Sequence, residues 1–238
     1  MSVILYSLVA ALAALLASVV PLKFNITSRR LTYLLAASAG ILLSIAFVDI
    51  LPEAFALSPF AGFGILAGFL IINFMEQFVI TEPSSEITED CKLHKVSMTA
   101  FAGLLFHSFI DGIAIAAGFG VSAALGEVIT FAVLIHAIPD GISASSLLLA
   151  SKYSSSRRKV FSLASIIALA KPAGAAAFLL LAGSVSSLFL SVVLGISAGS
   201  FIYVSAAGLL PHIHREKNLK IFLVFVLGIF LVLLGSLV

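Results

Sequence analysis

Two hexapeptides decide how this chain is organised: HSFIDG at residues 107–112 and HAIPDG at residues 136–141. Each reads His-x-x-x-Asp-Gly, and a spacing of four places the histidine and the aspartate on one helix face. Each also lies inside a long apolar stretch. Ionisable residues inside a membrane helix are costly and mark functional sites by default. Two imidazoles and two carboxylates that face one another would suit a borderline divalent metal ion.

The composition indicates that these stretches lie in a membrane. Of the 238 residues, 61% are hydrophobic and only 10% are charged, whereas soluble domains carry about 25% charged residues. We therefore expect an all-α integral membrane protein, with residues 1–238 forming a single transmembrane domain in the lipid bilayer. Cys91 is the only cysteine, which excludes an internal disulfide and a cysteine-rich metal cluster. No Gly-x-x-x-x-Gly-Lys string is present, so we expect no direct use of ATP. We expect no nucleic-acid partner.

Eight segments are apolar enough to cross a bilayer, which takes about 20 residues each. They are residues 2–21, 31–55, 60–80, 96–119, 124–151, 157–182, 186–211 and 219–238. All but one of the Lys and Arg residues fall in the odd-numbered connections between these segments or in the first three residues of the segment that follows. The positive-inside rule then places those connections, including a loop at about 81–95, in the cytoplasm. This predicts a multi-pass protein of the cell membrane with both termini outside the cytoplasm.

An internal repeat links two of the segments. SAG at residues 38–40 precedes LP at 51–52, and SAG at 197–199 precedes LP at 210–211 with the same spacing. Because the two segments cross in opposite directions, the repeat is inverted, as in many secondary transporters. Chance similarity between short motifs of small residues is the alternative. The repeat predicts that segments one to three and six to eight form an inverted pair of halves around segments four and five.

The two hexapeptides resemble segments four and five of ZIP (Zrt/Irt-like) divalent-metal transporters, whose patterns are H-[NS]-x-x-[DE]-G and H-x-x-P-[ED]-G. DILPEA at residues 49–54 and the stretch from FIYV at 201–204 to LP at 210–211 resemble the family's segments two and seven. The resemblance covers nearly the whole chain. It implies a transporter, not an enzyme, that moves a divalent transition metal, with zinc the foremost candidate, into the cytosol. Zn²⁺ or a related metal would be the substrate, no catalytic cofactor is expected, and the family suggests a homodimer.

The resemblance also assigns the central metal ligands residue by residue, as His107, Asp111, His136 and Asp140. The chain departs from the family's second-metal pattern at three positions. Ser108 stands where Asn is frequent, Ala137 where a carboxylate can occur, and Lys171 where segment six often supplies Glu. We therefore expect one metal ion at the midplane between segments four and five. The Lys171 ammonium would occupy the second-metal position, paired with Asp111 and Asp140 where segment six packs as in that family. The alternative is that Lys171 pairs elsewhere or loses its proton through burial.

Other polar residues mark a path through the membrane. Asp49 and Glu53, near the outer end of segment two, would attract cations to the entrance, or would form a pair at the membrane interface. At the opposite side, Glu76 at the inner end of segment three and His212 and His214 after segment seven would receive the ion at the exit. Glu76 would equally suit the interface alone.

The residues alone leave other functions open. One is an intramembrane metal-dependent hydrolase, although the chain has no His-Glu-x-x-His string and four ligands would close a tetrahedral shell. Another is a metal-binding membrane sensor without transport. The paired histidines and aspartates would also satisfy each other as interhelical hydrogen bonds. Metal uptake by purified protein in vesicles separates these possibilities.

Overall fold

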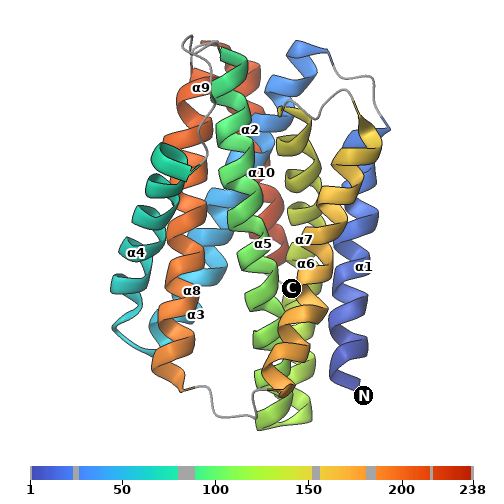
Figure 1. Cartoon of the computed structure of the whole chain (residues 1–238), viewed down its shortest axis with the longest axis vertical. Coiled ribbons are helices and arrows are strands. Elements are labelled where there is room, and N and C mark those ends of the chain that lie inside the picture. The colour runs from blue at the N-terminus through green and yellow to red at the C-terminus, as the bar shows by residue number, and fades with distance from the viewer. Residues whose placement is uncertain are drawn as a thin grey trace.

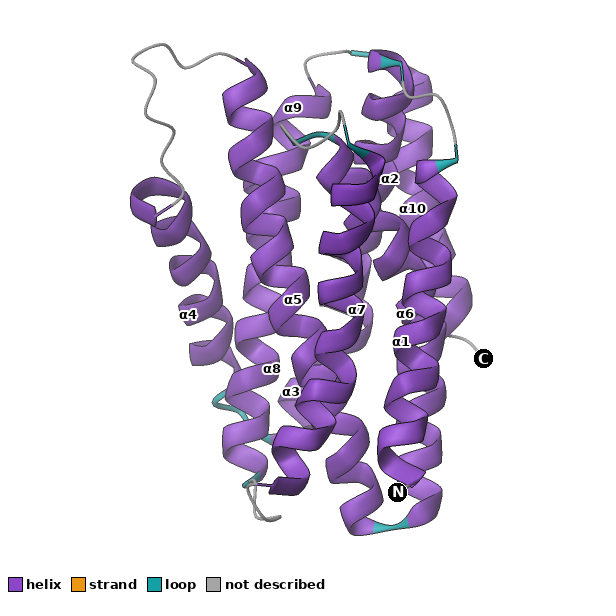
Figure 2. Cartoon of the chain, turned by 45° about the vertical axis from the view of Figure 1, so that its right-hand side comes forward, coloured by secondary structure: helices purple, strands orange, loops and turns teal. Residues whose placement is uncertain are grey.

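In a computed structural model, the chain forms a bundle of long helices that run nearly parallel or antiparallel (Figure 1). The structure describes residues 2–23, 27–79, 89–151, 156–180, 186–214 and 217–236, and no strand occurs within these ranges (Figure 2). The helices are α1 (Ser2–Leu22), α2 (Ser28–Ser44), α3 (Leu51–Leu57), α4 (Ala61–Phe74), α5 (Glu89–Val121), α6 (Ala123–Leu149), α7 (Arg157–Leu180), α8 (Ser187–Ile202), α9 (Leu210–His214) and α10 (Leu219–Ser236). Three π-helical segments join or extend them, η1 (Ile45–Ile50), η2 (Met75–Val79) and η3 (Tyr203–Leu209).

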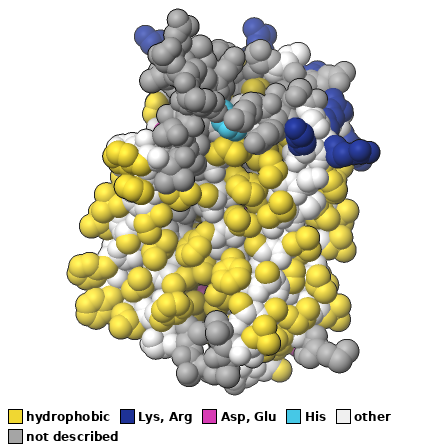
Figure 3. Space-filling model, viewed as in Figure 1, with side chains coloured by type: hydrophobic (Ala, Val, Ile, Leu, Met, Phe, Trp, Pro, Cys, Tyr) yellow, Lys and Arg dark blue, Asp and Glu magenta, His cyan; other side chains and the backbone are white. Residues whose placement is uncertain are grey.

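These elements make eight rods, because α2, η1 and α3 are continuous, as are α4 and η2, and α8, η3 and α9. Seven of the rods are long and apolar enough to cross a membrane, and the apolar part of α10, Leu219–Leu234, is shorter. Helices suit this solvent because they satisfy their backbone groups internally, where lipid offers no partner. Apolar side chains cover the middle of the visible face as a broad belt (Figure 3). The expected all-α, multi-pass membrane architecture is confirmed.

One predicted boundary differs from the structure. The loop expected at about 81–95 is shorter, because α5 already begins at Glu89, while residues 81–88 lie outside the described part of the chain. The expected start at residue 96 came from the point where the apolar run begins. Hydropathy marks the entry into lipid, but a helix continues into water when its side chains there are polar.

The basic side chains gather at one end of the bundle, which we call the basic end (Figure 3). The described members lie at the end of α1 and at the starts of α2, α7 and α10, and they are exposed: Lys23, Arg29, Arg30, Arg157, Arg158, Lys159, Lys217 and Lys220. The opposite end, which we call the far end, holds the N-terminus of α1 (Figure 1).

Helix packing follows the inverted repeat that the sequence predicts. α4 packs on α8 and α10 packs on α2, while α1 packs on α6 and α5 packs on α7. The repeat relates α1 to α7, α2 to α8, α4 to α10 and α5 to α6. Under this exchange the pair α4–α8 becomes α10–α2, and the pair α1–α6 becomes α7–α5. The π-helical segments agree, since η1 directly precedes Leu51-Pro52 and η3 directly precedes Leu210-Pro211. Proline displaces the carbonyl four residues earlier, which lies in the π-helical segment in both cases.

Close backbone contacts repeat as well. A Cβ atom added to Gly40 would collide with the carbonyl oxygen of Phe225 in α10, and one added to Gly199 would collide with that of Ile65 in α4. Gly40 and Gly199 occupy the same position in the two SAG motifs. Both repeats therefore use a glycine to bring a neighbouring helix into backbone contact, as small residues do in membrane bundles.

These contacts predict that Gly40→Ala and Gly199→Ala each destabilise the protein by about 1–3 kcal/mol, because the added methyl group meets backbone that cannot rotate away. Gly62→Ala is the matched control, since a Cβ atom there would meet nothing within 4 Å. Thermal unfolding in detergent measures the effect. A midpoint for Gly199→Ala equal to that of Gly62→Ala would contradict the close packing.

Candidate functional site

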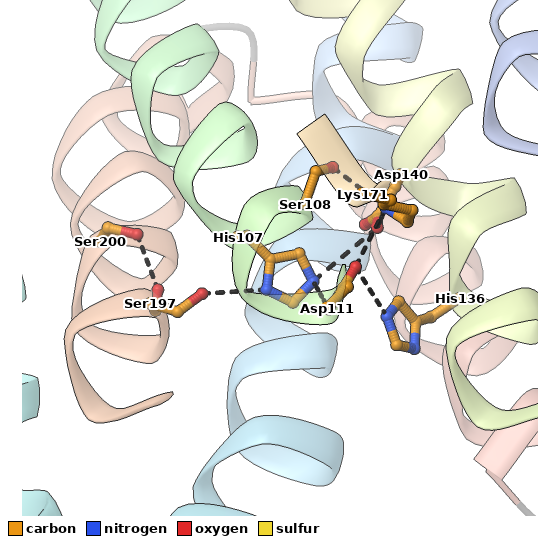
Figure 4. A network of polar contacts seen from close by, with 8 residues as sticks. All are labelled: His107, Ser108, Asp111, His136, Asp140, Lys171, Ser197 and Ser200. Atoms are coloured by element: carbon orange, nitrogen blue, oxygen red, sulfur yellow. Dashed lines mark hydrogen bonds and ion pairs between the residues drawn. The ribbon is translucent and has the colours of Figure 1, made fainter. Parts of the chain in front are cut away.

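The two hexapeptides meet at one buried point, where α5 and α6 face each other (Figure 4). Four candidate ligand atoms, one from each of His107, Asp111, His136 and Asp140, lie within 4.8 Å of one another. His107 Nε2 is 3.4 Å from Asp111 Oδ1 and 3.8 Å from Asp140 Oδ2. His136 Nε2 is 3.4 Å from Asp111 Oδ2. The structure therefore brings together all four residues that the sequence singled out.

The glycine that follows each aspartate sets the position of a neighbouring helix. Gly112 lets α5 approach the carbonyl of Lys171 in α7, and Gly141 lets α6 approach the carbonyl of Ala14 in α1. Any larger side chain would push these helices apart. The site is thus enclosed on two sides by helices that come from opposite halves of the repeat, with Lys171 and Ala14 in equivalent places.

The cluster leaves several polar atoms without hydrogen bonds. Asp140 is 2% exposed and neither of its carboxylate oxygens has a hydrogen-bond partner among the described residues. The same holds for Nε2 of both His107 and His136, whereas Asp111 Oδ2 is ion-paired with Lys171 at 3.0 Å. Buried polar atoms in native proteins are normally satisfied. Unsatisfied acceptors converging on one point are therefore suited to binding a cation.

The spacing and chemistry of these atoms fit a transition metal. In a tetrahedral zinc site with bonds of about 2.0 Å, neighbouring ligand atoms lie roughly 3.3 Å apart. The imidazole–carboxylate separations of 3.4 Å at Asp111 are close to that value. Two nitrogen and two oxygen ligands also suit borderline divalent ions such as Zn²⁺, Fe²⁺ and Co²⁺.

Lys171 supplies a cation beside the cluster from α7. Its side chain is fully buried, and Nζ lies 3.0 Å from Asp111 Oδ2 and 3.9 Å from Asp140 Oδ2. Nζ also donates a hydrogen bond to Ser108 Oγ at 3.0 Å. Asp111 and Asp140 are the partners that the sequence predicted for this lysine. The ammonium partly neutralises two carboxylates that would otherwise repel each other in a medium without water.

Ser197 of α8 orients one of the imidazoles. Its Oγ lies 2.9 Å from His107 Nδ1 (Figure 4), and the ring of Phe201 packs 4.7 Å from the His107 ring. If Nε2 binds a metal, Nδ1 carries the hydrogen and donates it to Ser197 Oγ, which fixes the ring. Ser197 was not predicted as a site residue. Its place at the start of the second SAG motif could have indicated that it packs close to the central segments.

A cavity of about 460 Å³ leads to the cluster from the far end of the bundle. Asp49 and Glu53, the predicted entrance residues, line it together with His107, Asp111 and His136. The His136 side chain is 14% exposed, whereas that of His107 is 2% exposed. Apart from Pro139, which lies near the middle of α6, the remaining lining residues come from the far-end halves of their rods, and they include Ala114, Val133, Leu194, Leu231 and Val232. An ion can therefore reach three of the four ligands from this end.

The predicted exit residues lie apart from this cavity. Glu76 lies in η2 and is partly exposed, near the basic end. His214 ends α9 and lines a separate cavity beside Lys217 and Asn218. His212 belongs to α9, but its side chain lies outside the described residues. Neither Glu76 nor His214 lines the cavity that holds the cluster.

Comparison with known proteins gives one family. The sequence profile described as ZIP zinc transporter matches residues 80–235, more than half of the chain. The human zinc transporter SLC39A7 is 33% identical over 131 residues, which are 52% of this chain and 28% of that protein. Zinc transporter zipt-7.2 of Caenorhabditis elegans is 30% identical over 158 residues, covering 58% of this chain and 32% of that protein. Protein zntA of Dictyostelium discoideum is 36% identical over 145 residues, covering 57% and 29%.

The cavity predicts selective access to one face of α5. In a Cys91→Ser background, Ala114→Cys should react with a hydrophilic maleimide at least about tenfold faster than Ile115→Cys. Ala114 lines the cavity, whereas the neighbouring Ile115 is fully buried against other apolar side chains. Labelling rates of purified protein in nanodiscs measure this. Equal rates at the two positions would mean that the cavity does not admit water.

Proposed function

The chain belongs to the ZIP zinc transporter family, and from that premise we propose that it carries a divalent transition metal, with zinc as the foremost candidate, across a membrane. The chain spans less than a third of the length of the curated relatives it matches, so the proposal rests mainly on its own site. One observation carries it: two His-x-x-x-Asp pairs from antiparallel apolar helices converge on a single buried point that a cavity reaches.

In this proposal the ion enters from the far end, which lies outside the cytoplasm. The gathering of Lys and Arg at the basic end supports that orientation, since cytoplasmic ends of membrane proteins carry such an excess. Both termini then lie outside the cytoplasm, and the membrane is the cell membrane. Asp49 and Glu53 raise the local concentration of cations at the entrance. Glu76, His212 and His214 receive the ion on the cytosolic side after the bundle has changed the end to which it opens.

The four ligands are proposed to hold a single ion. Lys171 is a cation fixed beside Asp111 and Asp140, and a second metal ion there would have to overcome its repulsion. Ser108 supports this reading, because its hydroxyl accepts the lysine's hydrogen bond. A homodimer stays a prediction that rests on the family resemblance.

A hydrolase is supported less well by the same geometry. Catalytic zinc sites keep one coordination position for water, with three protein ligands. Here four candidate ligands surround the point and would fill a tetrahedral shell, which leaves no position for water. A sensor without transport would bind metal equally well, so uptake is the measurement that separates it from a transporter.

Single alanine substitutions at His107, Asp111, His136 and Asp140 should each lower zinc uptake into proteoliposomes at least about tenfold, because each removes one of four ligands. Ser146→Ala is the control, since its hydroxyl bonds only the carbonyl of Ile142 one turn earlier in α6. A fluorescent zinc indicator inside the vesicles measures the rate. Full uptake by both aspartate variants would falsify the proposed site.

Lys171 makes a second prediction about the same site. Lys171→Glu should tighten zinc binding at least about tenfold, because a repelling charge next to the ion becomes an attracting one. Lys171→Ala should still bind a single ion but release it at a different rate. Calorimetry gives affinity and stoichiometry for purified protein. Two zinc ions bound beside an intact Lys171 would contradict the single-ion proposal.

A further inference from the structure

The two repeats place equivalent serines in different surroundings. Ser38 and Ser197 open the two SAG motifs, and both side chains are fully buried. Ser197 Oγ contacts His107 Nδ1 at 2.9 Å. Ser38 Oγ has no hydrogen-bond partner within the described part of the chain. A buried hydroxyl without a partner costs free energy and calls for an explanation.

The inverted repeat indicates which partner Ser38 lacks. α8 packs on α5, which carries His107, and α2 packs on α6, which carries His136. Exchanging the halves therefore turns the pair Ser197–His107 into the pair Ser38–His136. In this structure no serine contacts the His136 ring among the described residues, and that side chain faces the open cavity. The serine contact is thus made at His107, on the side of the site away from the cavity. It is absent at His136, on the side that the cavity opens.

Residues along the cavity show the same relation. Ala114, Val133 and Leu194 line the cavity that is open at the far end. Aligning the two hexapeptides makes Ser143 the equivalent of Ala114 and Leu104 the equivalent of Val133. Aligning the two SAG motifs makes Leu35 the equivalent of Leu194. These equivalents are at most 1% exposed, and Ser143 Oγ is another buried hydroxyl without a partner. At these three positions the basic-end half of the bundle therefore lacks the opening that the far-end half has.

We propose that the two serines exchange roles when the bundle opens at the basic end: Ser38 Oγ contacts His136 Nδ1, and Ser197 releases His107. This inference rests on the proposed function, since it requires that the site open at each end in turn. In each state the histidine on the closed side is held by a serine. The histidine on the open side is free to turn as the ion arrives or leaves. Ser38 and Ser197 are thus positioning residues for transport, one for each state.

The exchange can be tested without metal. Two reporter variants in a Cys91→Ser background, Ala114→Cys and Ser143→Cys, report water access from the far end and from the basic end, respectively. Ser197→Ala removes a contact of the present state, so the ratio of Ser143→Cys to Ala114→Cys labelling should rise about fivefold, the equivalent of one ordinary hydrogen bond. Ser38→Ala removes a contact of the other state, so the ratio should fall about fivefold.

Labelling by a hydrophilic maleimide in nanodiscs, where both ends are accessible, gives the two rates. Because both variants delete one buried hydroxyl, each controls for the other, and the double variant should return the ratio to its starting value. Ser38→Thr and Ser197→Thr, which keep a hydroxyl, should leave the ratio near that value. Shifts in the same direction, no shift, or a Ser143→Cys reporter that never reacts would overturn the exchange.

Zinc uptake by the same protein is measured separately in proteoliposomes. Opposite shifts of the labelling ratio in a protein that takes up no zinc would support the exchange and refute the proposed transport. Zinc uptake with unchanged labelling ratios would support the proposed transport and refute the exchange of serines. The two hypotheses therefore fail on different measurements.

Discussion

The structure depends on a lysine ammonium and two aspartates placed together where there is no water. Lys171 lies 3.0 Å from Asp111 and 3.9 Å from Asp140, and all three side chains are buried. Separately, each charge would be too costly at this depth in the bundle. The pairing requires α7 to lie directly against α5, which Gly112 and Gly174 permit by backbone contact. The positions of the central helices thus follow from the need to keep three charges together.

The same requirement leaves the site poised for a cation. One ammonium offsets only part of the charge on two carboxylates, and it does not satisfy the imidazole nitrogens that face them. The cluster therefore retains unused acceptors in a place that the cavity lined by Asp49 and Glu53 reaches. In the proposed function a divalent ion would supply the missing interactions, so that the residues of a stable fold would also form a metal site.

Local sequence was enough to predict much of this arrangement. Apolar runs of about 20 residues identify the rods, and a spacing of four places His107 with Asp111, and His136 with Asp140, on single helix faces. The partners of Lys171 were predicted from the family resemblance, which places segment six beside segments four and five, together with the need of a buried ammonium for a partner. The start of α5 at Glu89 was not predicted, because hydropathy reports lipid contact and not helix formation. The contact of Ser197 with His107 spans 90 residues of sequence and depends on how α8 packs on α5. Similarly, only the packed bundle shows which end of the path is open.

The lysine has one consequence for the energetics of the whole bundle. Two identical inverted halves would make the two open states mirror each other, and their energies would be equal. Gly112 brings α5 against Lys171, whereas Gly141 brings α6 against Ala14, so the two halves are unequal at their closest point to the site. The Lys171 ammonium would therefore make the two open states of the metal-free protein differ in energy. In the proposed transport cycle, the charge at residue 171 would contribute to a resting preference for one open state, independent of any gradient across the membrane.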